Sequence, residues 1–134
     1  MKLSLGEEEE ELKKRLLELV KKGICAEEEV EKYLSELRGL AGALYSYEEK
    51  QKLADFYKAL ADPTRIDMVR IIGTKTLAVC EITAILGISQ PTVTHHLKIL
   101  ERAGIIRSRR KGRLTYYELM KRELLEDFEK ILGS

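Results

Sequence analysis

One segment constrains the fold more than any other part of the chain. Residues 82–107 read as a helix, a tight turn at Gly87, a second helix opened by Ser89, and a strand after Gly104. At about 100° per residue, the second helix gathers apolar side chains on one side and short polar, His and Lys side chains on the other. This pattern predicts a helix-turn-helix whose second helix packs by one side and leaves the other side for a DNA groove.

The free side of that second helix, at residues 89–103, carries candidate DNA contacts. The packing side holds Val93, His96, Leu97, Leu100 and Ala103. The candidate contacts on this helix are Gln90, Thr92, Thr94, His95, Lys98 and Arg102. The amide of Gln90 can bond adenine, and Thr94 and His95 can reach base edges. Lys98 and Arg102 are better placed for phosphates, which position a protein without reading sequence. The alternative is a polar face that meets only solvent.

A basic hairpin follows the second helix. Strands are expected over residues 105–110 and 113–119, around a tight turn at Lys111-Gly112. Its tip carries the candidate DNA contacts Arg109, Arg110, Lys111 and Arg113. Such a wing would lie along the DNA backbone or enter the neighbouring minor groove. A basic turn that is only solvated is the alternative.

The charge distribution agrees with a polyanionic partner. The 134 residues have a net charge of +1, but residues 1–49 carry 8 basic and 13 acidic residues, and the rest carries 16 and 10. Residues 87–117 contain seven basic residues and one acid. A local basic patch with acid elsewhere suits the binding of nucleic acid at one surface. No nucleophile–base set, phosphate loop or complete metal site is evident, so we do not expect an enzyme.

The remaining chain reads as helices. They are expected over residues 7–22, 26–44, 47–61, 63–73, 79–86 and 122–132. Asp62 should cap the helix that Pro63 begins, and Gly73 should close it. The fold class is therefore mainly α with a small β-hairpin: a winged helix-turn-helix domain at 46–134 with a helical N-terminal extension at 1–45. That extension is either additional dimer surface or a sensing or partner-binding element.

Apolar stripes predict which sides of these helices pack. In the helix from Pro63, Ile66, Val69 and Ile72 should face inward. The helix over 26–44 has a stripe that ends at Leu44. The stripe of the last helix comprises Leu124, Leu125, Phe128, Ile131 and Leu132.

Five segments resemble the ArsR/SmtB winged-helix repressors over about residues 50–132. They are residues 59–66 (ALADPTRI), 79–82 (VCEI), 87–98 (GISQPTVTHHLK), 100–107 (LERAGIIR) and 112–117 (GRLTYY). The resemblance implies a homodimer formed by the helix around 47–61 and the last helix. It also implies two recognition helices on a palindromic double-stranded DNA operator, with half-sites about 10 bp or a multiple apart. Members of this family usually repress until an inducer, most often a metal ion, lowers their affinity for DNA.

The metal-binding part of the resemblance is incomplete. Where the family has Cys-Val-Cys and an acid, this chain has Ala78-Val-Cys-Glu81 and so lacks one cysteine. The second metal site of the family uses His and carboxylates on the last helix, and residues 121–134 hold carboxylates but no His. A soft-metal or metalloid site needs two to four converging thiolates. No complete ligand set is present, so we assign no metal ion or metalloid as cofactor, and Cys25 and Cys80 are the only candidate ligands. Alternatively, Cys80 is a small buried apolar residue and Cys25 is incidental.

The sequence thus predicts a transcriptional regulator, most readily a repressor, that binds an operator as a homodimer. Two alternatives stay open: a thiol-based metal or redox sensor that uses Cys25 and Cys80, and a winged-helix module that binds a protein. The N-terminus is acidic and has no signal peptide, and no apolar run approaches the ~18–20 residues of a membrane span. We therefore expect a cytoplasmic protein.

Overall fold

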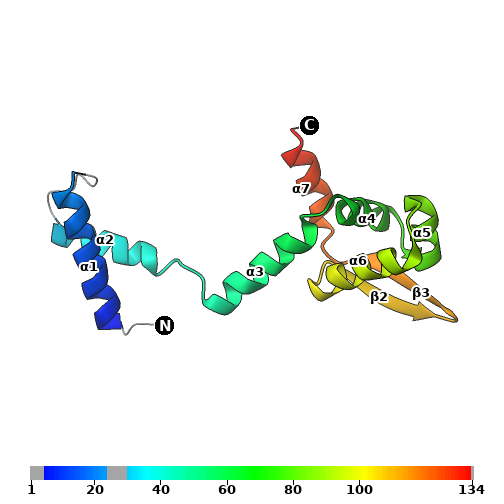
Figure 1. Cartoon of the computed structure of the whole chain (residues 1–134), viewed down its shortest axis with the longest axis horizontal. Coiled ribbons are helices and arrows are strands. Elements are labelled where there is room, and N and C mark those ends of the chain that lie inside the picture. Colours follow the sequence, from blue (N-terminus) through cyan, green and yellow to red (C-terminus); the bar gives the residue numbers. More distant parts are fainter. Residues whose placement is uncertain (1–4, 24–29, 134) are drawn as a thin grey trace. The chain divides into compact units, whose positions relative to one another are not determined.

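The structure, a computed structural model, describes residues 5–23 and 30–133 (Figure 1). The chain divides into two compact units, Met1–Ser46 and Tyr47–Ser134. The helices are α1 (Leu5–Lys21), α2 (Val30–Ala41), α3 (Tyr47–Leu60), α4 (Pro63–Thr74), α5 (Val79–Leu86), α6 (Gln90–Arg102) and α7 (Glu123–Ile131). The strands are β1 (Leu77–Ala78), β2 (Ile106–Lys111) and β3 (Leu114–Leu119). The predicted class, mainly helical with a small hairpin, is confirmed, although the sheet has a third strand.

The N-terminal unit is a pair of helices with a small apolar contact. Among its described residues, Leu16 of α1 and Leu34 of α2 are the buried side chains. Gly23, two residues after the end of α1, adopts a φ of +72°, at the position where a glycine was expected to stop the helix. The second helix is shorter than predicted: α2 ends at Ala41, and Leu44 beyond it is 72% exposed.

The core of the C-terminal unit lies between helices α4, α5 and α6 and the sheet. Its largest fully buried side chains are Met68, Val69, Ile72, Ile82, Val93, Leu97, Leu100, Ile105 and Ile106. These residues come from α4, α5, α6 and the start of β2, and they belong to one cluster, so α6 is held by its apolar side against a continuous core.

The start of α4 follows the prediction, and its packing side does not. Asp62 accepts a hydrogen bond from a backbone N–H of the first turn, at 3.1 Å, and Pro63 opens the helix. Ile66 was wrongly expected to face inward, since it is 38% exposed, and Met68 is fully buried instead. The helix also continues through Gly73 to Thr74.

Gly73 has a packing role in the interior of α4. A Cβ built there would lie 2.8 Å from both terminal methyl groups of Leu125 and 3.0 Å from a methyl group of Leu119. Real Cβ atoms essentially never approach this closely, so the missing side chain lets α7 and β3 lie close against α4.

The hairpin is shifted by one residue from the prediction. Lys111 pairs with Leu114, so the two-residue loop is Gly112-Arg113 rather than a turn centred on Lys111-Gly112. Gly112 has a φ of +64°, which suits a glycine at the first loop position. The unpredicted strand β1 pairs with β3 and gives the sheet order β1-β3-β2.

Within the part of the chain that the structure describes, none of the helices has the length and apolar character required to cross a bilayer.

Candidate nucleic-acid interface

The recognition helix α6 is defined by local signals at its start. The preceding helix α5 ends at Gly87, whose left-handed φ of +66° allows the tight turn. Ser89 then caps α6: its hydroxyl accepts from the N–H of Thr92 at 3.4 Å and also bonds the Thr92 hydroxyl at 2.8 Å. Val93 and Leu97 are fully buried below the helix. The helix is thereby held on its apolar side with its polar side outward.

The candidate contacts on α6 occupy the side that does not pack. Gln90, Thr92, His95, Lys98 and Arg102 are exposed, and Thr94 is half-buried. The Thr92 hydroxyl is engaged in the cap, so this residue also has a structural role. The ring of His96 is half-buried, with its Nδ1 atom 3.1 Å from Nη1 of Arg65, and its centroid lies 5.6 Å from that of the exposed His95 ring. The exposed residues form one polar surface that can meet a DNA groove.

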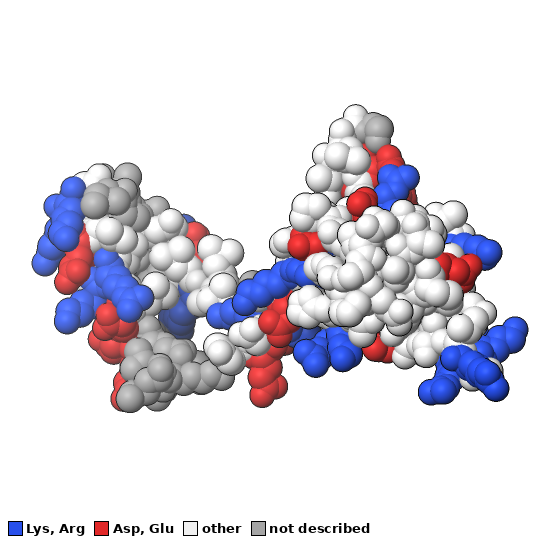
Figure 2. Space-filling view, turned by 45° about the vertical axis from the view of Figure 1, so that its right-hand side comes forward, with Lys and Arg blue, Asp and Glu red and all other residues white. Residues whose placement is uncertain are grey.

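The wing places four basic side chains at its tip. Arg109, Arg110, Lys111 and Arg113 are all exposed. Figure 2 shows Lys and Arg side chains gathered at the outer end of the β2–β3 hairpin, at the lower right, with no acidic side chain visible among them. This concentration of positive charge is suited to phosphates on either side of a groove.

Arg107, at the base of the wing, has a different environment. It pairs with Glu118, its cross-strand neighbour, through a hydrogen-bonded ion pair. The bond from Arg107 lowers the pKa of Glu118 below its ordinary value, and the charges of Arg107 and Arg109 act in the same direction. The base of the hairpin is therefore partly neutralised, whereas its tip is not.

Sequence reasoning missed two residues that connect the interface to the rest of the domain. Arg65 joins α4 to the end of α3 and to His96 of α6. Glu101 joins the end of α6 to Ser108 of β2. Both contacts join separate elements, so no helical or strand periodicity could have indicated them.

The candidate metal ligands do not form a site in the described residues. Cys80 lies in the first turn of α5 and is exposed, which corrects the alternative that it is a buried apolar residue. Glu81 accepts a hydrogen bond from the backbone N–H of Ala78 at 2.9 Å and so caps α5. Cys25 falls outside the described residues. In residues 5–23 and 30–133, no group of three or more His, Cys, Asp or Glu could hold a metal ion.

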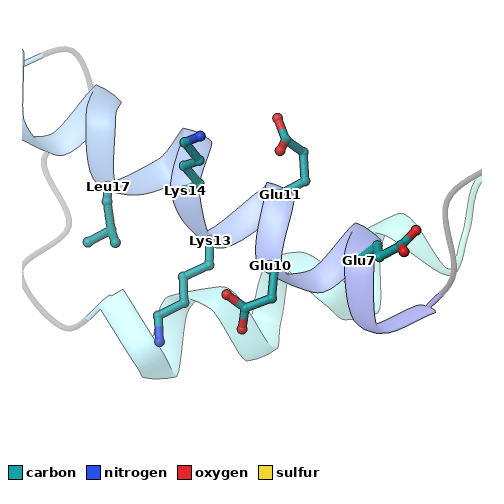
Figure 3. A pocket seen from close by; sticks show the side chains of 6 residues that line it. All are labelled: Glu7, Glu10, Glu11, Lys13, Lys14 and Leu17. Carbon is teal, nitrogen blue, oxygen red and sulfur yellow. The ribbon is translucent and has the colours of Figure 1, made fainter.

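A pocket on the N-terminal unit is lined by one helix, and all but one of its lining side chains are charged. Its lining residues are Glu7, Glu10, Glu11, Lys13, Lys14 and Leu17 of α1. Figure 3 shows that these side chains point to different sides of the helix rather than toward one point. Glu11 is also paired with Arg15 at 3.1 Å. The arrangement is therefore typical of a solvated helix surface rather than a ligand site.

A second, apolar surface lies between α3 and α7. A groove there is lined by Phe56, Tyr57, Leu60, Leu124, Phe128 and Ile131, with Glu123, Asp127 and Lys130 around them. Tyr57 is 66% exposed and Ile131 is 81% exposed. Within the C-terminal unit the predicted packing stripe of α7 is buried only in part, because Leu124 is buried whereas Ile131 and Leu132 are exposed. Apolar surface of this kind is typical of a contact with another protein surface.

Known proteins are similar to this chain both in sequence and in fold. The model of the family described as "Bacterial regulatory protein, arsR family" matches residues 62–108. A transcriptional repressor SmtB homolog from Synechocystis sp. is 29% identical over 99 residues, covering 74% of this chain and 75% of that protein. An uncharacterized HTH-type transcriptional regulator from Methanocaldococcus jannaschii is 36% identical over 74 residues, covering 54% of this chain and 83% of that protein.

A solved structure shows the same fold. It is the homodimeric winged helix-turn-helix DNA-binding domain of a possible ArsR-family transcriptional regulator from Mycobacterium bovis. Its TM-score is 0.58 at 23% identity, over 68% of this chain and 87% of that one. Over that part of the chain, the fold is therefore similar to that of a winged helix-turn-helix domain.

Proposed function

The chain belongs to the arsR family of bacterial regulatory proteins, which are DNA-binding transcriptional regulators and not enzymes, and from that premise we propose that it is a repressor that binds a palindromic operator as a homodimer. In this proposal α6 lies in the major groove, and the tip of the wing lies on the backbone or in the minor groove. The protein acts in the cytoplasm, where the operator DNA is.

The observation that carries the proposal is the exposed polar side of α6 beside the basic tip of the wing. Gln90, Thr94 and His95 supply groups for base edges. The charges that would lie on phosphates come from Lys98, Arg102, Arg109, Arg110, Lys111 and Arg113. Phosphate contacts fix the register of the helix on the duplex, and base contacts select the sequence.

The apolar groove between α3 and α7 supports the homodimer. Tyr57 and Ile131 expose large apolar side chains there, and the similar domain from Mycobacterium bovis is homodimeric. A two-fold dimer through this groove presents two copies of α6, so the operator should be a palindrome with half-sites about one helical turn, roughly 10 bp, or a multiple apart. The SmtB homolog of Synechocystis is a repressor, and repression is therefore the direction of regulation proposed here.

The test is a binding titration of the full chain against DNA from its own promoter region, with a scrambled duplex as the control. We expect the promoter to bind at least ~10³-fold more tightly than the scrambled duplex at physiological salt. Equal affinity for both duplexes at every salt concentration would overturn the proposal and favour a module that binds a protein.

The same titration examines a sensing function. The exposure of Cys80 makes its thiol accessible to soft metals and oxidants. As(III), Cd(II), Zn(II) and a mild oxidant are therefore added in separate arms. If an addition weakens promoter binding by the unchanged chain but not by Cys80→Ser, the result would support a thiol-based sensor. Promoter binding that none of the additions changes would contradict it.

A further inference from the structure

We infer that Arg65 is a positioning residue, which holds the recognition helix in its place relative to α3 through His96. The inference rests on the proposed function, because it concerns how α6 is presented to an operator. Arg65 lies in the first turn of α4 and is half-buried. It touches two other helices and is itself part of a third.

The guanidinium of Arg65 makes three hydrogen bonds to protein acceptors. Nε donates to the carbonyl oxygen of Ala59 at 2.6 Å, and Nη2 donates to that of Lys58 at 3.3 Å. Nη1 lies 3.1 Å from Nδ1 of His96. Both carbonyls belong to the last turn of α3, where a positive charge is favourable. The carbonyl oxygen of Lys58 also accepts from the backbone N–H of Ala61 at 3.2 Å.

The bond to His96 ties its ring to α4. The guanidinium group of Arg65 can only donate, so Nδ1 of His96 is the acceptor in this contact. The planar fork of arginine suits three acceptors in fixed directions better than the single flexible ammonium of lysine. The His96 ring is therefore held at a defined place on the side of α6 that packs.

The position of His96 matters for DNA because His95, its neighbour, projects from α6 about 100° further around the helix axis. The centroids of the two rings are 5.6 Å apart. A rotation or shift of α6 at His96 moves His95 and Thr94 with it. In the proposed dimer, α3 lies at the contact between the two copies, so the Arg65 link relates the dimer contact to the recognition helix. All three of its donor nitrogens face protein acceptors, which argues against a role as a phosphate contact.

The test compares Arg65→Met and Arg65→Lys with the unchanged chain, measuring affinity for the promoter duplex and for a scrambled duplex over a range of salt concentrations. We expect Arg65→Met to lose about tenfold in promoter affinity, the order expected for hydrogen bonds to a charged group. Its affinity for the scrambled duplex and its salt slope should stay unchanged. Arg65→Lys should recover only part of the loss, and urea unfolding establishes that each variant is folded.

Two further variants make the test specific. Arg70→Met removes the same charge from the same helix, where Arg70 pairs with Glu129 at the surface, and should leave promoter affinity unchanged. The double variant of Arg65→Met and His96→Leu should have the same promoter affinity as the single variant that binds the promoter less tightly, because both substitutions break the same link.

Three outcomes would overturn the inference. Unchanged promoter affinity in a folded Arg65→Met variant would show that the link does not position α6. A salt slope reduced by about 0.9, with weaker binding to the scrambled duplex, would make Arg65 a phosphate contact instead. If the unchanged chain itself does not prefer its promoter, the proposed function fails, and the inference fails with it.

Discussion

Glu101 and Ser108 connect the recognition helix to the wing. Oε2 of Glu101, near the end of α6, accepts from the backbone N–H of Ser108 at 3.1 Å and from its hydroxyl at 2.7 Å. The same carboxylate adds to burial in raising the pKa of Tyr117, the cross-strand partner of Ser108, above its ordinary value. The one acid in the basic stretch of residues 87–117 therefore holds together the two parts of the candidate interface.

Glu101→Gln should reduce specificity while it strengthens nonspecific binding. The amide keeps the size of the side chain, but it weakens the two charge-assisted bonds to Ser108 and removes a negative charge from a basic surface. We expect affinity for a scrambled duplex to rise, and the preference for the promoter to fall by about tenfold, near 1.4 kcal/mol. Asp67→Asn, an exposed site on α4, is the charge control. If Glu101→Gln raises the affinity for the promoter and for the scrambled duplex by the same factor, Glu101 has no positioning role.

Removal of Arg110 should weaken binding to every sequence alike. It is exposed at the tip of the wing, where a phosphate contact would release about 0.9 counterion per charge. The slope of log affinity against log salt should therefore fall by roughly 0.9 in Arg110→Ala. The control removes Arg107 and Glu118 together, since that pair already neutralises itself, and should leave the slope unchanged. If Arg110→Ala discriminates between sequences, the wing reads bases.

The exposed side of α6 should carry the sequence preference. We expect His95→Ala or Gln90→Ala to cost about 1–3 kcal/mol on the promoter and to relax specificity, because their side chains would read base edges. Lys98→Ala should weaken promoter and scrambled duplexes equally, as a phosphate contact does. Competition titrations with single base-pair changes measure the effect. Unchanged promoter affinity in His95→Ala would mean that another side of the helix faces the DNA.

The parts of the fold that could be predicted are those with signals close together in the sequence. The cap at Asp62, the left-handed Gly87 and the buried side of α6 are set by a few neighbouring residues each. The packing side of α4 was not predictable in the same way. Ile66 and Met68 both fit an apolar periodicity, and the burial of Met68 depends on how α4 lies against α6 and β3.

The features that the sequence did not reveal depend on tertiary contacts. The strand β1 has two residues, too few for an alternating pattern, and exists because β3 lies beside it. Arg65 and His96 are 31 positions apart, so only the assembled domain brings them together. The candidate DNA contacts could be named in advance because helical periodicity alone separates the exposed side of α6 from its packed side.

The cap at Asp62 should contribute stability that depends on pH. A hydrogen bond from the backbone N–H of Arg65 lowers the pKa of Asp62 below its ordinary value. Its stabilisation is therefore fully present above the unfolded pKa, near 3.9, and is lost as the pH falls through the lower folded pKa. Asp62→Ala should reduce the free energy of unfolding by about 1 kcal/mol at pH 7, and by less at pH 3.

Urea denaturation at pH 7, 5 and 3 measures that difference. Asp62→Asn is the matched control, because asparagine also caps helices but does not titrate. Its stability should lie near that of the unchanged chain at pH 7. A deficit of Asp62→Ala that stays constant down to pH 3 would show that the carboxylate charge adds nothing to the cap.

Gly73→Ala should destabilise the C-terminal unit even though alanine is the better helix former. In a helix interior, alanine raises the free energy of unfolding by up to ~1 kcal/mol relative to glycine. Its Cβ, however, would lie 2.8 Å from both terminal methyl groups of Leu125, and overpacking of this kind costs about 1–3 kcal/mol. Leu119 lies 3.0 Å from the same Cβ position, so the new methyl group meets both leucine side chains. We expect a net loss of about 1 kcal/mol in urea denaturation.

A double-mutant cycle separates the two effects in Gly73→Ala. In a Leu125→Ala background the clashing methyl groups are gone, so the same substitution should become neutral or stabilising. Gly39→Ala, in α2 with no atom within 4 Å of its new Cβ, should show the helix preference alone and stabilise its own unit. If Gly73→Ala stabilises the unchanged chain as well, then Leu125 moves aside at little cost, and the close approach of α7 to α4 does not require glycine.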